Sequence, residues 1–234
     1  MSYHWAVATD RGRIRKINED TLYPPTSGKG DGPTVVLVAD GMGGHIAGER
    51  ASAVATERAV ESKGSLKERV EAANIAIFEE IDRHPELAGM GTTMTLFELG
   101  EDGVVRFAHV GDSRAYLYRD GELSQMTADH TVVAEYLRRG TITPDEVATH
   151  PQRSLITRAL GLQADIEIDT GEEPVRPGDR LLLCSDGVNA MIDDDSIADS
   201  LALETPEEAV WDLVEKANRA GGHDNITAIV VQVD

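Results

Sequence analysis

The sequence contains one cysteine, Cys184, in 234 residues, so no disulfide can form within the chain. This usage is typical of a reducing compartment, and we expect a cytoplasmic protein. No apolar run approaches the roughly 20 residues that cross a bilayer, and the first five residues lack the pattern of a secretory signal. Positive charge is also scarce: 22 lysines and arginines stand against 42 aspartates and glutamates, a net charge of −20. Such a chain repels nucleic acids and anionic membranes, so we expect neither as a partner.

The rest of the composition, 41% hydrophobic and 27% charged, is typical of a globular protein. Runs of strand-forming residues predict strands at 5–9, 34–39, 93–99, 104–110, 115–118, 180–184 and 226–233. An apolar face from Leu66 to Ile81 predicts a helix, and capping boxes at Ser65, Thr143 and Thr205 mark three helix starts.

The strands come in consecutive groups and do not alternate strictly with helices. This order favours antiparallel sheets covered by helices, an α+β fold, in one domain over residues 1–234. The Pro- and Gly-rich segment 24–33 is expected to be a turn-rich connector between the first strands. The segment from about 129 to 160 is expected to be an insertion over the edge of the sheets.

Acidic residues stand at the ends of several of these strands. They are Glu19 and Asp20 after the first strand, Asp40 after 34–39, Asp112 after 104–110, Asp186 after 180–184, and Asp224 before 226–233. A buried strand fixes the position of the residue that follows it, and a neighbouring glycine lets the backbone turn sharply. We therefore expect these carboxylates to meet at one rim of the sheets.

A cluster of carboxylates repels itself, and some members take up protons unless cations bind. Because the cluster offers only oxygen ligands, it predicts hard divalent ions, Mg²⁺ or Mn²⁺, in preference to Zn²⁺. A single Asp-Gly pair is more often an ordinary turn, as we expect at Asp102-Gly103 and Asp120-Gly121. The repeated placement of acids at strand ends is what indicates a metal site.

An ordered set of motifs covers nearly the whole chain. It comprises Thr9-Asp10-Arg11-Gly12, Arg15-Lys16-Ile17-Asn18-Glu19-Asp20, Ala39-Asp40-Gly41-Met42-Gly43-Gly44-His45, Gly48-Glu49, Gly91-Thr92-Thr93, His109-Val110-Gly111-Asp112-Ser113-Arg114, Thr127-Ala128-Asp129-His130, Ile156-Thr157-Arg158-Ala159-Leu160-Gly161, Leu183-Cys184-Ser185-Asp186-Gly187 and Asp224-Asn225-Ile226-Thr227. In this order the motifs resemble the metal-dependent protein phosphatases, also called type 2C phosphatases, in their bacterial form. The resemblance implies a four-layer α-β-β-α sandwich, with two antiparallel sheets flanked by helices and a flap near the metal site at about 129–160.

The resemblance also implies a role for each matching residue. Asp40 would bridge two metal ions, with the Gly41 carbonyl as a backbone ligand, and Asp186 and Asp224 would complete the first ion. Glu19 and Asp20 would lie beside the second ion, one binding directly and the other through water. Asp112, with Asp186, would hold a third ion, and Arg15 would bind the substrate phosphate. Two or three Mn²⁺ or Mg²⁺ ions would then activate a water for attack on phosphorus.

One position departs from the family pattern. Met42 stands where animal members carry a histidine that is often assigned as the general acid. His45 is a candidate proton donor, and a local hydrogen-bonding role for it is an equal alternative. The identity of the donor therefore stays open.

The implied function is hydrolysis of phosphoserine and phosphothreonine in proteins, opposite bacterial Ser/Thr kinases. The expected partners are phosphorylated proteins, these kinases among them, and the expected state is a monomer. Two alternatives stay open: a phosphatase for small phosphoesters or phosphotyrosine, and a catalytically inactive module that binds phosphoproteins. An inactive module predicts a lost metal ligand, and none is missing. A cysteine phosphatase is excluded, because the residue six positions after Cys184 is Ala190 and not arginine.

Overall fold

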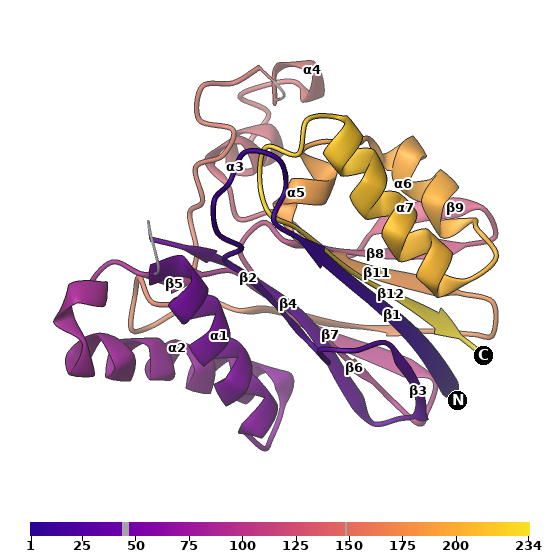
Figure 1. Cartoon of the computed structure of the whole chain (residues 1–234), viewed down its shortest axis with the longest axis horizontal. Coiled ribbons are helices and arrows are strands. Elements are labelled where there is room, and N and C mark those ends of the chain that lie inside the picture. Colours follow the sequence, from indigo (N-terminus) through magenta and orange to yellow (C-terminus); the bar gives the residue numbers. More distant parts are fainter. Residues whose placement is uncertain (44–46, 148) are drawn as a thin grey trace.

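A computed structural model describes residues 1–43, 47–147 and 149–234. The centre of the fold is formed by two antiparallel sheets that are stacked face to face (Figure 1). The first sheet has the strand order β3-β1-β12-β11-β8-β9. Its strands are β1 (Ser2–Asp10), β3 (Gly28–Asp31), β8 (Arg114–Arg119), β9 (Glu122–Gln125), β11 (Arg180–Cys184) and β12 (Ile226–Val233). Helices α6 (Asp194–Leu201) and α7 (Pro206–Arg219) cover its outer face.

The second sheet has the order β10-β7-β6-β4-β2, with the short β5 paired to β4. Its strands are β2 (Asp20–Tyr23), β4 (Thr34–Met42), β5 (Gly91–Thr92), β6 (Met94–Leu99), β7 (Val104–Val110) and β10 (Asp169–Pro174). Helices α1 (Ala47–Glu61) and α2 (Leu66–Arg83) cover the outer face of this sheet (Figure 1). The predicted four-layer α-β-β-α arrangement is confirmed.

The shorter helical segments lie in the connections between these layers. They are the 3₁₀ turn η1 (Pro85–Leu87), then α3 (Val132–Arg138), α4 (Pro144–Val147) and α5 (Asp186–Asn189). Within the described ranges, no helix combines the length and the apolar character that a membrane span requires.

Strand β12 shows how the layers are held together. Ile229, Val231 and Val233 pack in the cluster between the two sheets, whereas Ala228 and Val230 pack in the cluster under α7. Alternate residues of a strand point to opposite faces, so a strand such as β12, which is apolar at nearly every position, is buried on both sides. This central strand therefore fixes the position of the residues that precede it, including Asp224.

All seven predicted strands are present, with bounds that differ by at most a few residues. The expectation that 24–33 is only a connector was wrong, because β3 lies within it and pairs with β1. The ring of Trp5 packs over Gly28 and Gly30 of this strand. The capping boxes at Ser65 and Thr205 are confirmed. At Thr143 only half of the box forms: the Glu146 carboxylate accepts from the Thr143 backbone, and the four-residue α4 follows.

Asn74 on α2 anchors the loop that follows the predicted flap. It is 1% exposed; its Nδ2 donates to the carbonyls of Gln163 and Ala164, and its Oδ1 accepts from the Gly161 amide at 2.8 Å. We expect Asn74→Ala to lower the free energy of unfolding by about 3 kcal/mol, because several polar groups lose their partners. Urea denaturation measures this, with the exposed Lys67→Ala on the same helix as a control within about 0.5 kcal/mol. Equal effects of the two substitutions would contradict this account of the loop.

His109 on β7 is a fully buried imidazole. Its Nδ1 lies 2.8 Å from the Thr95 hydroxyl and its Nε2 lies 3.2 Å from the Ala128 carbonyl. Burial, and then the neighbouring His130, lowers the pKa of His109 to about 4. An unfolded imidazole titrates near pH 6.5, so below that pH the unfolded chain takes up a proton that the folded chain does not.

The fold therefore loses stability as the pH falls from about 6.5 to about 4, by on the order of 3 kcal/mol from this one group. We expect His109→Gln, which retains a polar side chain, to reduce the decline in unfolding free energy between pH 6.5 and 4.5 relative to the wild type. Denaturant unfolding at several pH values measures the difference. If the unfolding free energies of the two proteins fall equally with pH, His109 takes up its proton in the folded state as readily as in the unfolded state.

Candidate active site

The acidic residues predicted from the sequence lie at one end of both sheets. Asp20 begins β2 and pairs in register with Asp40 near the end of β4. Asp112 lies in the turn between β7 and β8, Asp186 begins α5 two residues after the end of β11, and Asp224 lies two residues before β12. Residues that are far apart in the chain are thus brought to one rim.

All of these side chains except Asp20 line one cavity of about 560 Å³. It is lined by Arg15, Lys16, Ile17, Glu19, Asp40, Gly41, Met42, Gly43, Asp112, Ser154, Ile156, Asp186 and Asp224. Asp20 is not a lining residue; the Ser185 hydroxyl donates to its carboxylate at 2.8 Å. Ser154 and Ile156 belong to the predicted flap, so that segment forms part of the cavity wall.

Two glycines allow the backbone segments of the site to approach closely. A Cβ at Gly41 would collide with the carbonyl of Gly48 at the start of α1. A Cβ at Gly187 would collide with the carbonyl of Asn225. The residues that follow Asp40 and Asp186 therefore need to be glycine for these elements to meet.

The backbone of Asp40 is held on both sides by threonines. Its amide donates to the Thr93 hydroxyl at 3.0 Å, and its carbonyl accepts from the Thr93 amide at 2.9 Å and the Thr92 hydroxyl at 2.8 Å. These bonds fix the main chain while the carboxylate faces the cavity. Asp40 is thus rigidly positioned among the other acids.

Arg15 lies among these acids. Its Nη2 donates to Asp224 Oδ2 at 2.6 Å, and its Nη1 is 3.8 Å from Glu19 Oε2. The loop that carries Arg15 is held by Asn225, whose Nδ2 donates to the carbonyls of Arg11 and Ile17, each at 2.9 Å. The Asn225 Oδ1 accepts from the Glu19 amide at 2.8 Å. One buried side chain therefore ties the arginine loop to the start of β12.

The carboxylates raise one another's affinity for protons. Burial raises the pKa of Asp20 and of Asp112 to about 7 and that of Asp186 to about 6, and the neighbouring carboxylates add to each rise. Burial and four neighbouring aspartates raise the pKa of Asp40 well above its ordinary value. Burial also raises the pKa of Glu19. The cluster therefore favours either protons or cations at neutral pH.

Several carboxylate oxygens in this cluster are buried and accept no hydrogen bond from the described residues. They are Glu19 Oε1, Asp20 Oδ1, Asp112 Oδ1 and Asp186 Oδ1. A buried oxygen without a donor is costly unless a proton or a cation neutralises it. Oxygen-only ligands at this density fit Mg²⁺ or Mn²⁺.

Within the described part of the chain, no three acidic, histidine or cysteine side chains are already spaced to hold one ion. Arg15 instead stands between Asp224 and Glu19. An ion held by these residues would have to draw the carboxylates closer together. Met42 lines the cavity, as its place in the motif implies. The candidate proton donor His45 lies outside the described residues.

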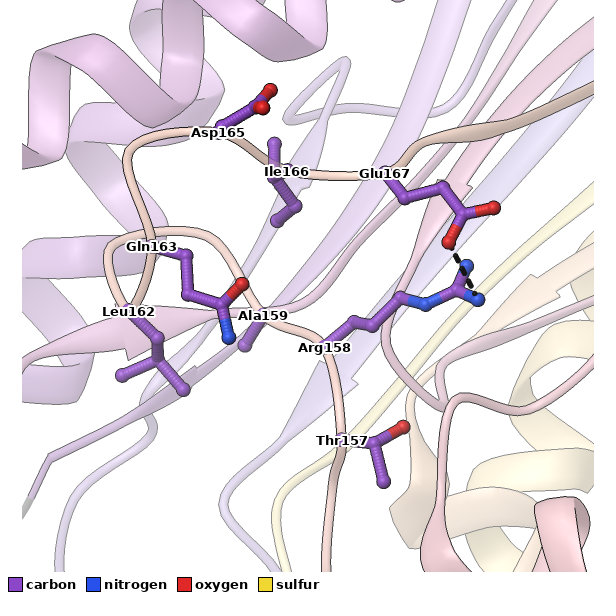
Figure 2. A pocket seen from close by; sticks show the side chains of 8 residues that line it. All are labelled: Thr157, Arg158, Ala159, Leu162, Gln163, Asp165, Ile166 and Glu167. Atoms are coloured by element: carbon purple, nitrogen blue, oxygen red, sulfur yellow. Dashed lines mark ion pairs between the residues drawn. The ribbon is translucent and has the colours of Figure 1, made fainter.

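A second cavity, of about 410 Å³, lies where the predicted flap returns to the sheet (Figure 2). It is lined by Thr157, Arg158, Ala159, Leu162, Gln163, Asp165, Ile166 and Glu167. Its arginine, Arg158, pairs with Glu167 at 3.0 Å and with Asp169 at 3.1 Å. No unpartnered buried carboxylate oxygen of the described residues lies here, so the aspartate cavity is the candidate active site.

Three further residues of the site were not singled out from the sequence. Lys16 and Ser154 line the cavity, and Asn225 holds the arginine loop. Lys16 and Asn225 stand inside the quoted motifs, next to Arg15 and Asp224, and that adjacency was the available signal. Ser154 had none, because its position depends on how the segment 129–160 folds back over the rim.

The stacked sheets, their flanking helices and the carboxylate rim are the features that the sequence resemblance implied for a metal-dependent hydrolase. The model of the family described as "Protein phosphatase 2C" matches residues 13–226. The chain belongs to this family.

Named relatives and solved structures agree with this assignment. The chain is 42% identical over 240 residues to the serine/threonine protein phosphatase PstP of Mycobacterium tuberculosis, covering 98% of this chain and 45% of PstP, so it spans about half the length of that relative. It is 37% identical over 245 residues to the serine/threonine phosphatase stp of Listeria monocytogenes, covering 99% of this chain and 96% of stp.

A crystal structure of the M. tuberculosis phosphatase PstP/Ppp superposes with a TM-score of 0.91 at 39% identity and covers all of both chains. The catalytic domain of PstP in complex with two manganese ions superposes with a TM-score of 0.88 at 37% identity, covering 100% of this chain and 99% of that one.

Proposed function

We propose that this protein is a Mn²⁺- or Mg²⁺-dependent phosphatase that hydrolyses phosphoserine and phosphothreonine in other proteins. The observation that carries the proposal is the group of buried carboxylate oxygens without hydrogen-bond donors, in and beside a cavity that also holds Arg15. Relatives named as serine/threonine phosphatases, one of them crystallised with two manganese ions, support it.

In this proposal the aspartates hold two or three ions. Asp40, Asp186 and Asp224 are the central ligands, with the Gly41 carbonyl beside them. Glu19, Asp20 and Asp112 extend the ligand set. When bound, the ions supply a water of lowered pKa and offset the charge of the phosphate.

Arg15 binds the phosphate in this proposal. A guanidinium donates parallel hydrogen bonds to two phosphate oxygens, and it offsets the charge that builds on them during transfer. Arg15 already lies within the acidic cavity, beside Asp224 and Glu19. Ions held by those carboxylates would compete with Arg15 for them, and the guanidinium would then be available to the substrate phosphate. With Met42 in the cavity wall, the identity of the proton donor stays open, and His45 is one candidate.

The cellular context belongs to the same proposal. The substrates are phosphorylated proteins, including Ser/Thr kinases, and the protein acts as a monomer in the cytoplasm. Residues 1–234 form one catalytic domain in which the segment 129–160 serves as a flap over the active site. The position of Ser154 and Ile156 in the cavity wall supports that role.

The proposal is tested by an assay on phosphothreonine, phosphoserine and phosphotyrosine peptides and on p-nitrophenyl phosphate, with Mn²⁺ titrated in. We expect turnover of the phosphothreonine and phosphoserine peptides that EDTA abolishes and Mn²⁺ restores. Faster turnover of p-nitrophenyl phosphate or phosphotyrosine than of every phosphothreonine peptide would favour the small-ester alternative. No turnover with tight phosphopeptide binding would indicate a binding module.

A further inference from the structure

The loop that carries Arg15 concentrates positive charge in an acidic chain. Arg11, Arg13, Arg15 and Lys16 lie within six residues, and all four are exposed. The whole sequence has 42 acidic residues and only 22 lysines and arginines. Such a concentration beside a candidate phosphate site is not explained by the binding of a single phosphate group.

Three of these four cations lack an acidic partner among the described residues, although the chain is rich in acids; Arg13 is one of them, and it lines a different groove. Arg15 pairs with Asp224 and Glu19, but Lys16 and Arg11 form no ion pair with any residue that the structure describes. Lys16 lines the same cavity as the aspartates. A positive charge therefore faces the substrate side of the site without being neutralised by the protein.

The loop is held in one shape before any substrate arrives. Asn225 donates to the carbonyls at both of its ends, Arg11 and Ile17. The Arg13 amide donates to the Gly222 carbonyl at 2.8 Å, and the Arg11 guanidinium donates to the Lys16 carbonyl at 3.3 Å. This last bond brings the Arg11 side chain to the main chain of Lys16. A loop ordered in this way loses little conformational entropy on binding an anion.

We propose that Lys16, with Arg11 beside it, binds an acidic side chain of the substrate. This acidic residue lies close in sequence to the phosphorylated residue. The inference rests on the proposed phosphatase function, because it assumes that the phosphate lies at Arg15. Side chains two residues apart in an extended peptide are separated by roughly 7 Å and lie on the same face. A carboxylate in that position can reach the neighbouring cation, and the substrate class is thus a phosphopeptide with aspartate or glutamate beside the phosphoresidue.

Arg13 offers a matched control within the same loop. It carries the same charge, yet it lines a different groove beside α7, together with Glu208, Trp211 and Glu215. Lys16→Gln and Arg13→Gln change the net charge of the protein equally. Any difference between the variants therefore reports on the position of the charge and not on the overall field.

The experiment compares kcat/KM for three phosphothreonine peptides. Both the second residue before the phosphothreonine and the second residue after it are aspartate in the first peptide, alanine in the second and lysine in the third. We expect the wild type with Mn²⁺ to prefer the aspartate peptide over the alanine peptide by about tenfold at low salt. Lys16→Gln should reduce this preference to about twofold or less, through a higher KM for the aspartate peptide. Arg13→Gln should keep both the preference and the wild-type turnover of p-nitrophenyl phosphate, whereas Lys16→Gln should lose more activity on the aspartate peptide than on the alanine peptide or p-nitrophenyl phosphate.

Two results would overturn the inference while leaving the phosphatase function intact. One is a wild type that does not distinguish the aspartate and alanine peptides. The other is an equal loss of preference in both variants, which would indicate only long-range attraction that salt screens. Failure of the wild type to turn over every peptide and the small ester would contradict the proposed function itself, and this subsite with it.

Discussion

Asp40→Asn is expected to lower kcat/KM for phosphothreonine peptides by about a thousandfold or more while the metal-free protein becomes no less stable. Asp40 lies at the centre of the cluster, and four other aspartates raise its pKa. Removing its charge removes a carboxylate that would hold the ions, and the ions would supply a water of lowered pKa. The same change relieves repulsion, because a charged Asp40 is disfavoured in the folded state.

This combination of lost activity and retained or raised stability separates a functional role from a structural one. A residue that merely holds the fold would lose stability and activity together. Turnover with Mn²⁺ and the melting temperature of the metal-free protein at pH 8 are the two measurements. Asp82→Asn, an exposed change on α2, is the matched control and should alter neither. Activity within tenfold of the wild type, or a marked fall in melting temperature, would remove Asp40 from the proposed centre.

The central strands could be predicted from the sequence because they are apolar at nearly every position. β11 and β12 are buried almost throughout, and strand-forming residues fill both. The missed strands lie at or near sheet edges. β10, for example, has the sequence Asp-Thr-Gly-Glu-Glu-Pro, and half of its residues are exposed. Its pairing with β7 depends on backbone bonds to a neighbour already in place, and residue type alone does not reveal that.

The acidic rim could be predicted for a similar local reason. Asp40, Asp112, Asp186 and Asp224 each lie at or within two residues of the end of a strand that the sequence reveals, so the strand end fixes the position of the acid. Glu19 and Asp20 lie beside β2, a strand that was missed, and only the resemblance indicated their place. The contacts that complete the site are of another kind. Asn225 bonds to the carbonyls of Arg11 and Ile17, more than 200 residues away in the sequence, and no short-range pattern encodes such a bond. The charge left unpaired at Lys16 likewise becomes visible only when the surroundings of the loop are known.

Mn²⁺ is expected to stabilise the fold more at pH 8 than at pH 5.5. The pKa values of Asp20 and Asp112 are raised to about 7 and that of Asp186 to about 6, chiefly by burial. An unfolded aspartate titrates near pH 3.9, so between about pH 4 and pH 7 the folded chain binds more protons than the unfolded chain. These three aspartates therefore lower the free energy of unfolding of the metal-free protein as the pH rises through that window. Bound cations are expected to restore this loss of stability.

At pH 5.5 the ions must displace protons, whereas at pH 8 the carboxylates are already charged and repel one another. If 1 mM Mn²⁺ is about a hundred times the dissociation constant at pH 8, the gain is about 2.7 kcal/mol, or roughly 5–10 °C in melting temperature. Calorimetric melting with and without Mn²⁺ at each pH measures the gain, and comparing the two at one pH cancels the opposing titration of His109. Binding at pH 6.5 should also release protons, seen as a heat that depends on the ionisation enthalpy of the buffer. Equal gains at both pH values, with no buffer dependence, would mean that the ions bind elsewhere than among these aspartates.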